Sequence, residues 1–310
     1  MVRKSFFLFA AFLVLITQSP WVCFCQTGAP APLVYLPFDE GSGTTTLNQG
    51  TVGGTGTFVS AAEFDTFIPE GEYAPTSNAS SLNLGDGIET ALGSGVTFPF
   101  DPMIGLTQFT ITAWVYPTTE DYGPGGNRIF TTWQRGDEGT PNRRAGVELV
   151  WLNQQYQFSV NQAPDWPTDL YVGPYSGDGT SFSDYDWQFV AVTYDTRTDD
   201  LEFFPDAQMY AGYKGYDGVV QYYIGETGME AELWTEEIFD TGPVNPPAVD
   251  PEMMIGSFTT YIMSTYSGHE NRQFRGWIDE VRVYDEVLTL DQILEVQRGV
   301  VTPVSNWSLY

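Results

Sequence analysis

The segment Phe274-Arg275-Gly276-Trp277-Ile278-Asp279-Glu280-Val281-Arg282-Val283-Tyr284-Asp285 is the most regularly patterned stretch of the chain. Its alternation of side chains with period two is typical of a β-strand with a buried face. The alternation places Asp279 on the same face as Val281 and Val283. An isolated charge on an apolar face is too costly to keep. We therefore expect Asp279 to be hydrogen-bonded, paired or bound to a metal, or else to cap a loop near the strand end.

A short helix is predicted directly after this strand. Thr289 and Gln292 have the spacing of a capping box, in which the two side chains satisfy free backbone N–H groups. The apolar positions that we expect this helix to bury are Leu290, Ile293, Leu294 and Val296. No other long helical pattern occurs, and Gly and Pro interrupt nearly every apolar run. The chain therefore reads as an all-β protein, a sandwich or barrel of short strands with one short C-terminal helix.

The strands that the apolar alternation predicts are spread over the whole chain. The Phe109–Pro117 segment is the clearest in the first half, and 187–195 is the clearest in the second. We expect residues 201–204 to pair with 187–195, and 146–152 to form a hairpin with 156–160. The remaining predicted strands are 33–40, 57–67, 81–84, 128–133, 219–224, 231–239 and 253–258.

The N-terminus has the composition of a secretory signal peptide. Arg3 and Lys4 precede an apolar run that is shorter than a transmembrane helix requires, and small residues follow this run. We expect residues 1–25 to be this leader, 26–32 a lead-in, 33–298 one domain and 299–310 a tail. The protein would then be secreted to an extracellular, periplasmic or cell-surface location. Both cysteines lie in the leader, so the mature form would have neither a thiol nor a disulfide.

The charge of the chain narrows the classes of partner. It has 40 acidic and 12 basic residues and a formal net charge of −28. Such a surface repels phosphate backbones and anionic membranes, which argues against nucleic-acid binding and membrane insertion. The charge is explained either by solubility or by an acidic binding site, and it makes divalent cations plausible partners.

Four motifs in order give the chain a family resemblance. They are Phe38-Asp39-Glu40-Gly41-Ser42-Gly43-Thr44, Phe109-Thr110-Ile111-Thr112-Ala113-Trp114-Val115, Trp187-Gln188-Phe189-Val190-Ala191-Val192-Thr193-Tyr194 and Gly276-Trp277-Ile278-Asp279-Glu280-Val281-Arg282-Val283-Tyr284. Together they resemble the laminin-G-like jellyroll domains of the concanavalin A-like lectin/glucanase superfamily. The resemblance implies a sandwich of two curved antiparallel sheets with adjacent first and last strands. It also implies that many relatives hold a structural Ca²⁺ and bind glycans or proteins through loops.

A calcium site follows from the resemblance as a hypothesis. Adjacent terminal strands would bring Asp39 close to Asp279, and two neighbouring carboxylates suit a hard cation. The acidic loop that helps to surround the ion in many relatives is replaced here by residues 47–54, which contain no acid. Backbone carbonyls and Asn48 are the local substitutes.

The superfamily also contains glucanases, which carry a Glu-x-Asp-x-x-Glu run on one strand. The nearest run here begins Glu63-Phe64-Asp65 and has Ile68 where the acid/base carboxylate is required. His269 is the only histidine, which excludes a His-based zinc site or a two-histidine relay. A lyase with a tyrosine base remains an alternative. The enzyme question stays open, although the missing motif favours a non-catalytic protein.

Aromatic residues in the connecting segments suggest binding as the function. Exposed rings beside Asp and Asn suit the faces and hydroxyl groups of sugars. The candidate ligand-binding residues are Trp166, Tyr171, Tyr175, Tyr210, Tyr213, Tyr216, Tyr261 and Tyr266. Some of these rings could instead cover sheet edges. We expect a lectin-like protein whose partners are glycans. The first alternative is an adhesion module that binds cell-surface proteins. The second alternative is a polysaccharide hydrolase or lyase of the same fold.

Overall fold

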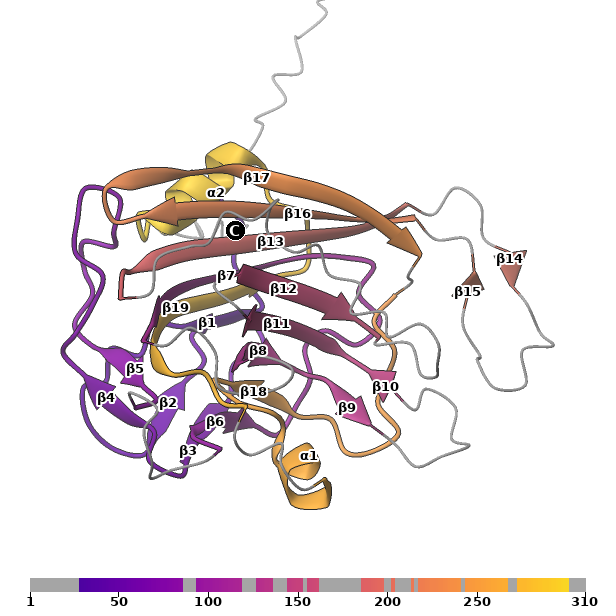
Figure 1. The fold of residues 1–310 in the computed structure, drawn as a ribbon, viewed down its shortest axis with the longest axis horizontal. Helices are drawn as coiled ribbons and strands as arrows, with labels where there is room; N and C mark the ends of the chain where they lie inside the picture. The colour runs from indigo at the N-terminus through magenta and orange to yellow at the C-terminus, as the bar shows by residue number, and fades with distance from the viewer. Residues whose placement is uncertain are drawn as a thin grey trace, which may run out of the picture.

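The computed structural model forms a sandwich of two antiparallel β-sheets (Figure 1). The residues that it describes are 28–85, 93–118, 127–135, 144–152, 155–161, 185–197, 202–203, 213–214, 217–240, 243–266 and 272–300. The predicted all-β, two-sheet jellyroll class is confirmed. No helix in the described ranges is long and apolar enough to cross a bilayer.

The first sheet, sheet A, contains the long strands of the domain. Its order is β17-β16-β13-β7-β19-β5-β4, and β1 pairs with β19 beside this path. The bounds are β1 (Val34–Leu36), β4 (Glu63–Asp65), β5 (Ser81–Asn83), β7 (Gln108–Pro117), β13 (Gln188–Arg197), β16 (Asp217–Glu226), β17 (Met229–Asp240) and β19 (Gly276–Tyr284). The β1–β19 pairing, with Leu36 opposite Val281, confirms that the first and last strands are adjacent.

The second sheet, sheet B, faces sheet A across the core. Its order is β12-β11-β8-β18-β6-β3-β2. The bounds are β2 (Thr45–Leu47), β3 (Thr55–Val59), β6 (Gly95–Phe98), β8 (Asn127–Thr131), β11 (Val147–Leu152), β12 (Gln155–Val160) and β18 (Met253–Ile255). Two short pairs complete the described strands, β9 (Gln134–Arg135) with β10 (Arg144–Ala145) and β14 (Glu202–Phe203) with β15 (Tyr213–Lys214). The predicted hairpin is the β11–β12 pair.

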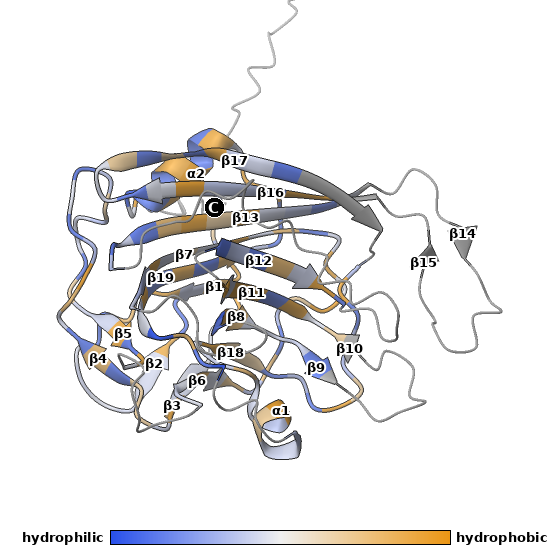
Figure 2. Cartoon of the chain, viewed as in Figure 1, coloured by the Kyte–Doolittle hydropathy of each residue, from blue (hydrophilic) through white to orange (hydrophobic). Residues whose placement is uncertain are grey.

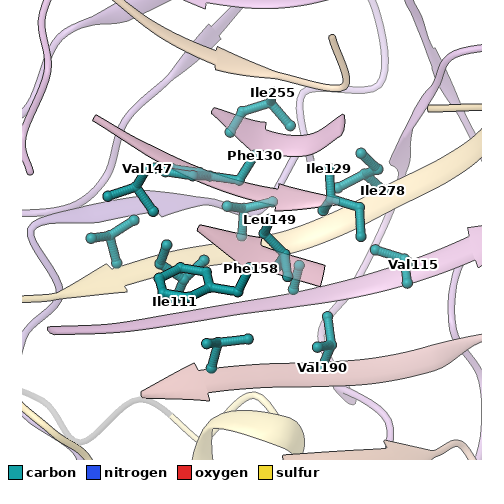
Figure 3. Close-up of a cluster of buried hydrophobic side chains, with 14 of the residues drawn as sticks. Ile111, Val115, Ile129, Phe130, Val147, Leu149, Phe158, Val190, Ile255 and Ile278 are labelled. Carbon is teal, nitrogen blue, oxygen red and sulfur yellow. The ribbon is translucent and has the colours of Figure 1, made fainter. Parts of the chain in front are cut away.

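The core lies between the two sheets, and both contribute to it (Figure 3). Ile111, Val115, Val190 and Ile278 project from sheet A, while Ile129, Phe130, Val147, Leu149, Phe158 and Ile255 project from sheet B. Hydrophilic and hydrophobic residues follow one another along strands such as β11 and β12 (Figure 2). The polar residues of these two strands alternate with core residues, yet Glu148, Gln157 and Ser159 are buried as well.

A second apolar cluster covers part of the outer face of sheet A. Helix α2 (Leu290–Gln297) lies beside β17 (Figure 1), and Ile293 and Val296 pack against Trp114 and Phe189. The predicted capping box of Thr289 and Gln292 is present. Leu290 was expected to be buried but is 41 % exposed. It is the first residue of the helix, on the side away from the sheet.

Three local predictions were wrong. Residues 202–203 do not pair with β13, which lies between β7 and β16; they pair with β15. The single strand expected over 57–67 is split into β3 and β4, because Ser60 turns the chain with a φ of 59°. The sequence predicts only the C-terminal helix, but the chain also forms helix α1 (Thr260–Thr265) after β18, and Glu252 accepts hydrogen bonds from its first backbone N–H groups. A cap from a residue eight positions earlier gives no local helix-start signal.

A bulge in β19 corrects the expected position of Asp279. The pairing of β19 with β7 shifts register between Asp279 and Arg282, and Glu280 has a φ of 52°. Such an extra residue reverses the alternation beyond it. Asp279 therefore does not share a face with Val281 and Val283, which are both in the core, but lies on the outer face.

Candidate functional site

Five aromatic residues from separate segments meet on the outer face of sheet A, next to the apolar cluster that α2 covers. They are Phe67 after β4, Tyr116 in β7, Tyr185 and Trp187 before β13, and Trp277 in β19. We call this set the aromatic patch. It brings together residues from four parts of the chain, which makes it a product of the fold and not of one loop.

Strand pairing places these rings on one surface. Trp277 pairs with Tyr116 on one side and with Asn83 of β5 on the other, and Asn83 pairs with Glu63. Their neighbours Val115 and Ile278 belong to the core, so Tyr116 and Trp277 must point away from it. Gly276 is required beside them, since a Cβ there would lie 1.9 Å from the Tyr116 carbonyl oxygen.

The rings pack against one another at steep angles. Phe67 lies 4.8 Å from Tyr116 at 89° and 4.9 Å from Trp277 at 66°, measured between centroids and ring planes. Tyr116 and Trp277 are 5.5 Å apart at 81°. Phe67 and Trp187 are the nearest to parallel, at 5.6 Å and 31°. Edge-to-face contacts of this kind add about 0.5–1.5 kcal/mol each beyond burial, so the patch is pre-organised.

Asp65 holds the patch together. Its Oδ2 accepts hydrogen bonds from Trp277 Nε1 at 3.0 Å and from Asn83 Nδ2 at 3.1 Å. Its Oδ1 accepts one from the Phe67 backbone N–H at 3.2 Å. One carboxylate thus fixes the indole of Trp277 and the turn that carries Phe67. Asp65 is a positioning residue for both rings.

The patch is partly open to solvent and acidic at its margin. Phe67 is 39 % exposed and Tyr185 is 62 % exposed, while Tyr116 and Trp277 are half-buried. Tyr185 has a φ of 67°, a conformation that costs energy in a residue other than glycine, and its N–H donates to the Pro117 carbonyl. Burial raises the pKa of the Tyr116 hydroxyl, and the charge of Asp186 raises it further.

The predicted ligand-binding residues are only partly covered by the structure. Trp166, Tyr171, Tyr175, Tyr210 and Tyr216 lie outside the described residues, as does His269. The backbone of Tyr213 belongs to β15. Tyr261 lies in α1 and Tyr266 is its C-cap residue, so these two are brought together by one short helix.

Tyr261 and Tyr266 belong to a smaller aromatic cluster on sheet B. They pack with Met263 around the buried residues Trp133, Phe258 and Ile262. The Arg128 guanidinium lies 3.7 Å from the centre of the Phe258 ring and its Nε donates to Glu148 at 2.9 Å. The ion pair is buried, and the Phe258 ring lies against it.

The two expected calcium ligands lie near each other, as the resemblance implied. Asp39 Oδ1 accepts hydrogen bonds from the backbone N–H groups of Ala79 and Ser80, and Asp279 accepts from Asn78 Nδ2 and from the Glu280 N–H. Burial raises the pKa of Asp279 well above its usual value, and the charges of Glu280 and Asp39 raise it further. Both carboxylates therefore tie the 78–80 segment to the terminal strands.

The surroundings of Asp279 only partly match a cation site. Asn48, the expected substitute ligand, instead bridges its own loop, accepting from Tyr35 N–H and donating to the Gly53 carbonyl. Asn78 Oδ1 is buried and has no hydrogen-bond partner. Within the described ranges, no group of three or more His, Cys, Asp or Glu side chains is arranged to hold a metal.

Sequence reasoning missed the aromatic patch because its residues sit inside strands and strand ends. Tyr116 and Trp277 lie within predicted strands, whereas the predicted binding residues come from connecting segments. The available signal was the alternation itself, since Val115 and Ile278 take the core positions and leave their aromatic neighbours outside. The role of Asp65 has no sequence signal, because Trp277 lies 212 positions away.

Comparison with known proteins agrees with this architecture. No curated protein matches the chain in sequence. Domain 4 of AbnA, a GH43 extracellular arabinanase from Geobacillus stearothermophilus, in complex with arabinotriose, superposes with a TM-score of 0.50 and 14 % identity over 86 % of this chain and 98 % of that one.

Two further solved structures have lower similarity. The botulinum neurotoxin type G receptor-binding domain has a TM-score of 0.44 and 13 % identity, covering 86 % of this chain and 51 % of that one. The CBM40 of the Ruminococcus gnavus IT-sialidase has a TM-score of 0.39 and 18 % identity, covering 68 % and 96 %. Residues 90–230 match the laminin-G family model of the concanavalin A-like lectin/glucanases superfamily, in agreement with the resemblance of the sequence motifs to that family.

Proposed function

We propose that the protein is a secreted, non-catalytic glycan-binding domain and that the aromatic patch is its binding surface. The observation that carries this proposal is the convergence of Phe67, Tyr116, Tyr185, Trp187 and Trp277 on one partly exposed face. Aromatic rings bind the apolar faces of sugars, and polar groups beside them bind hydroxyls. Surface rings gathered in one place mark interaction sites more often than scattered ones do.

The polar margin of the patch suits sugar hydroxyl groups. Glu63 is exposed in the same cross-strand row as Trp277 and Tyr116, and Asp186 is exposed beside Tyr185. Carboxylates and tyrosine hydroxyls can accept hydrogen bonds from a sugar at low cost when both remain near water. The AbnA domain, which has this fold, is known in complex with arabinotriose. A fold that can present a sugar site supports the proposal without fixing its position.

The chemistry of Glu63 and Asp65 favours binding over hydrolysis. A glycosidase needs one carboxylic acid and one carboxylate on opposite sides of the scissile bond. Both oxygens of Asp65 already accept hydrogen bonds from Phe67, Asn83 and Trp277. Ile68 takes the place of the third acid of the glucanase run. A soluble activity screen on β-glucans and uronic polysaccharides separates a hydrolase or lyase from the binding protein proposed here.

We also propose a structural Ca²⁺ near Asp39 and Asp279. The buried, unpartnered Asn78 Oδ1 and the neighbouring carboxylates of Asp39 and Asp279 support a bound cation. Calcium accepts carboxylate, amide and backbone oxygens together. The ion would offset the charge on Asp279 and hold the two ends of the domain.

The calcium proposal is tested by thermal unfolding with Ca²⁺ and with a chelator. We expect the chelator to lower the Tm of the wild type, since an ion at 100 times its Kd adds about 2.7 kcal/mol to stability. In the Asp39→Ala variant, Ca²⁺ and the chelator should each change the Tm less than they do in the wild type. A Tm that is the same in both conditions contradicts a bound structural ion.

A glycan array and affinity gels of soluble polysaccharides test the binding proposal. We expect retention by at least one class of glycan and no release of reducing sugar from it. Absence of retention on every glycan contradicts the proposal and favours an adhesion module that binds cell-surface proteins. Release of product would instead place the protein among the enzymes of its superfamily.

A further inference from the structure

The geometry of the aromatic patch also points to the class of glycan. We propose that it binds a single, soluble, uncharged polysaccharide chain, and neither a crystalline polysaccharide surface nor an anionic glycan. This inference rests on the proposed function and adds the substrate class to it. Two independent features carry it, the angles between the rings and the sign of the surrounding charge.

The rings do not form a flat platform. A crystalline surface presents coplanar sugar rings, so a side chain array that binds it must be coplanar as well. Tyr116 stands at 89° to Phe67, at 81° to Trp277 and at 61° to Trp187. Only Phe67 and Trp187 approach a common orientation, at 31°. A corrugated surface of this kind fits one twisted chain that can turn different edges toward different rings.

The rings cannot easily flatten to accept a crystal face. Trp277 is fixed by its hydrogen bond to Asp65, and Tyr116 pairs with Trp277 within the ladder of sheet A. Trp187 is only 7 % exposed. Phe67 is tied through its N–H to Asp65 and through its carbonyl to Ser81 Oγ at 2.7 Å. Each of these four rings is fixed by the structure around it, so the angles between them are set by the fold.

The charge at the patch opposes an anionic chain. Glu63, Asp65 and Asp186 surround the rings, and Asp186 is close enough to raise the pKa of Tyr116. Arg275 lies two residues before Trp277, just ahead of β19, and it has an interaction of its own. A uronate or sulfate placed on the rings would lie within the Debye length of these carboxylates, about 8 Å at physiological salt. The whole chain adds to this repulsion with a net charge of −28.

Hydroxyl groups face no such penalty. Carboxylates are acceptors only, and a neutral sugar supplies O–H donors to each of them. The exposed hydroxyl of Tyr185 can donate or accept. An uncharged chain therefore satisfies the polar margin while its apolar faces cover Phe67 and Tyr185, the two most exposed rings.

The experiment compares three kinds of probe with the same protein. The probes are soluble neutral polysaccharides (arabinan, xylan, mixed-linkage glucan and galactomannan), soluble anionic polysaccharides (polygalacturonate and alginate), and crystalline cellulose and chitin. Binding is measured by affinity electrophoresis for the soluble probes and by depletion for the solids, each in 50 mM and 500 mM NaCl. Calcium is kept constant, because it gels the anionic probes.

We expect at least one neutral chain to bind, with a Kd that changes less than twofold between the two salt concentrations. The anionic and crystalline probes should bind at least tenfold more weakly. Phe67→Ala should weaken the neutral interaction at least fivefold, Phe67→Tyr should retain it, and Leu47→Ala, which truncates an exposed residue of sheet B, should leave it unchanged.

The outcomes separate the two proposals. Preferential binding to a crystalline solid, or to an anionic chain, overturns the substrate class while glycan binding stands. Neutral binding that Phe67→Ala leaves intact, with the far-ultraviolet circular dichroism of the variant unchanged, overturns the assignment to this patch. If no probe binds, the proposed function itself fails and the substrate class fails with it.

Discussion

At the scale of single residues, Asp65 gives the most direct link between stability and the site. Asp65→Ala removes the acceptor of three donors, the Phe67 N–H, Asn83 Nδ2 and Trp277 Nε1. We expect a loss of about 1–2 kcal/mol in the free energy of unfolding, because the site is half-buried and water can replace some bonds. Glycan affinity should also fall, and by more than the small increase in the unfolded fraction would cause, since both Phe67 and Trp277 lose their positions.

Asp65→Asn is the matched variant for this prediction. Its amide oxygen can still accept from Trp277, so it should fall between wild type and Asp65→Ala in both measurements. Chemical denaturation followed by tryptophan fluorescence gives the stability, and titration with the best array ligand gives the affinity. Equal affinity in all three proteins would contradict the positioning role of Asp65.

Asp101 predicts a pH dependence of stability. Burial raises its folded-state pKa to about 7, although its Oδ1 accepts from the Met103 N–H. Its unfolded value is about 3.9. A raised folded pKa means that the folded state favours the proton, so this contribution to stability is complete below pH about 4 and is lost as the pH rises through about 7.

Asp101→Asn removes this titration while its amide can keep the bond to Met103. The variant should gain stability relative to wild type between pH 4 and pH 8, by on the order of 4 kcal/mol. Urea unfolding at the two pH values measures the change. A difference between wild type and variant that does not vary with pH would show that Asp101 titrates normally.

At the scale of elements, the bulge in β19 decides which residues meet. Glu280 occupies it in a left-handed conformation and forms a buried ion pair with Arg282, while Tyr35 Oη donates to Glu280 at 3.2 Å. Arg282 also donates to the Val296 carbonyl at the end of α2. The bulge therefore joins β1, β19 and α2 through one charged network.

Glu280→Ala should be among the most destabilising single changes in the protein. It leaves the Arg282 guanidinium buried without its carboxylate, which costs about 3–5 kcal/mol. Glu230→Ala is the control, because its ion pair with Arg298 is exposed and such pairs contribute about 0–1 kcal/mol. Thermal unfolding of both variants tests the comparison, and a similar loss in both would contradict the importance of the network.

The same element shows what the sequence could and could not predict. Alternation over Phe109–Pro117 and 187–195 predicted β7 and β13, and the capping box predicted α2, because these signals are local. Alternation failed at Asp279, since a bulge inserts one residue without any compositional mark. The site was missed for a related reason. Phe67 and Trp277 become neighbours only through sheet pairing, and loop composition contains no information on that pairing.

At the scale of the whole molecule, the charge predicts a response to salt. A net charge of −28 opposes the compact state by self-repulsion, which ions screen. We expect the Tm to rise when NaCl is increased from 0.05 to 0.5 M. Scanning calorimetry measures the Tm in this NaCl series and in a series of a neutral osmolyte at the same molar concentrations. The osmolyte stabilises only by its exclusion from the protein surface, so the difference between the two series reports the screening of charge repulsion. A Tm that falls with NaCl would mean that attractive pairs outweigh the repulsion.

We infer that the fold assembles one binding surface on the outer face of sheet A. Isothermal titration of the best array ligand into wild type, Phe67→Ala, Tyr261→Ala and Leu47→Ala tests it most directly, because Tyr261 represents the rival cluster on sheet B. We expect at least a fivefold loss of affinity for Phe67→Ala and wild-type affinity for the other two variants. Lost affinity in Tyr261→Ala together with full affinity in Phe67→Ala would contradict it.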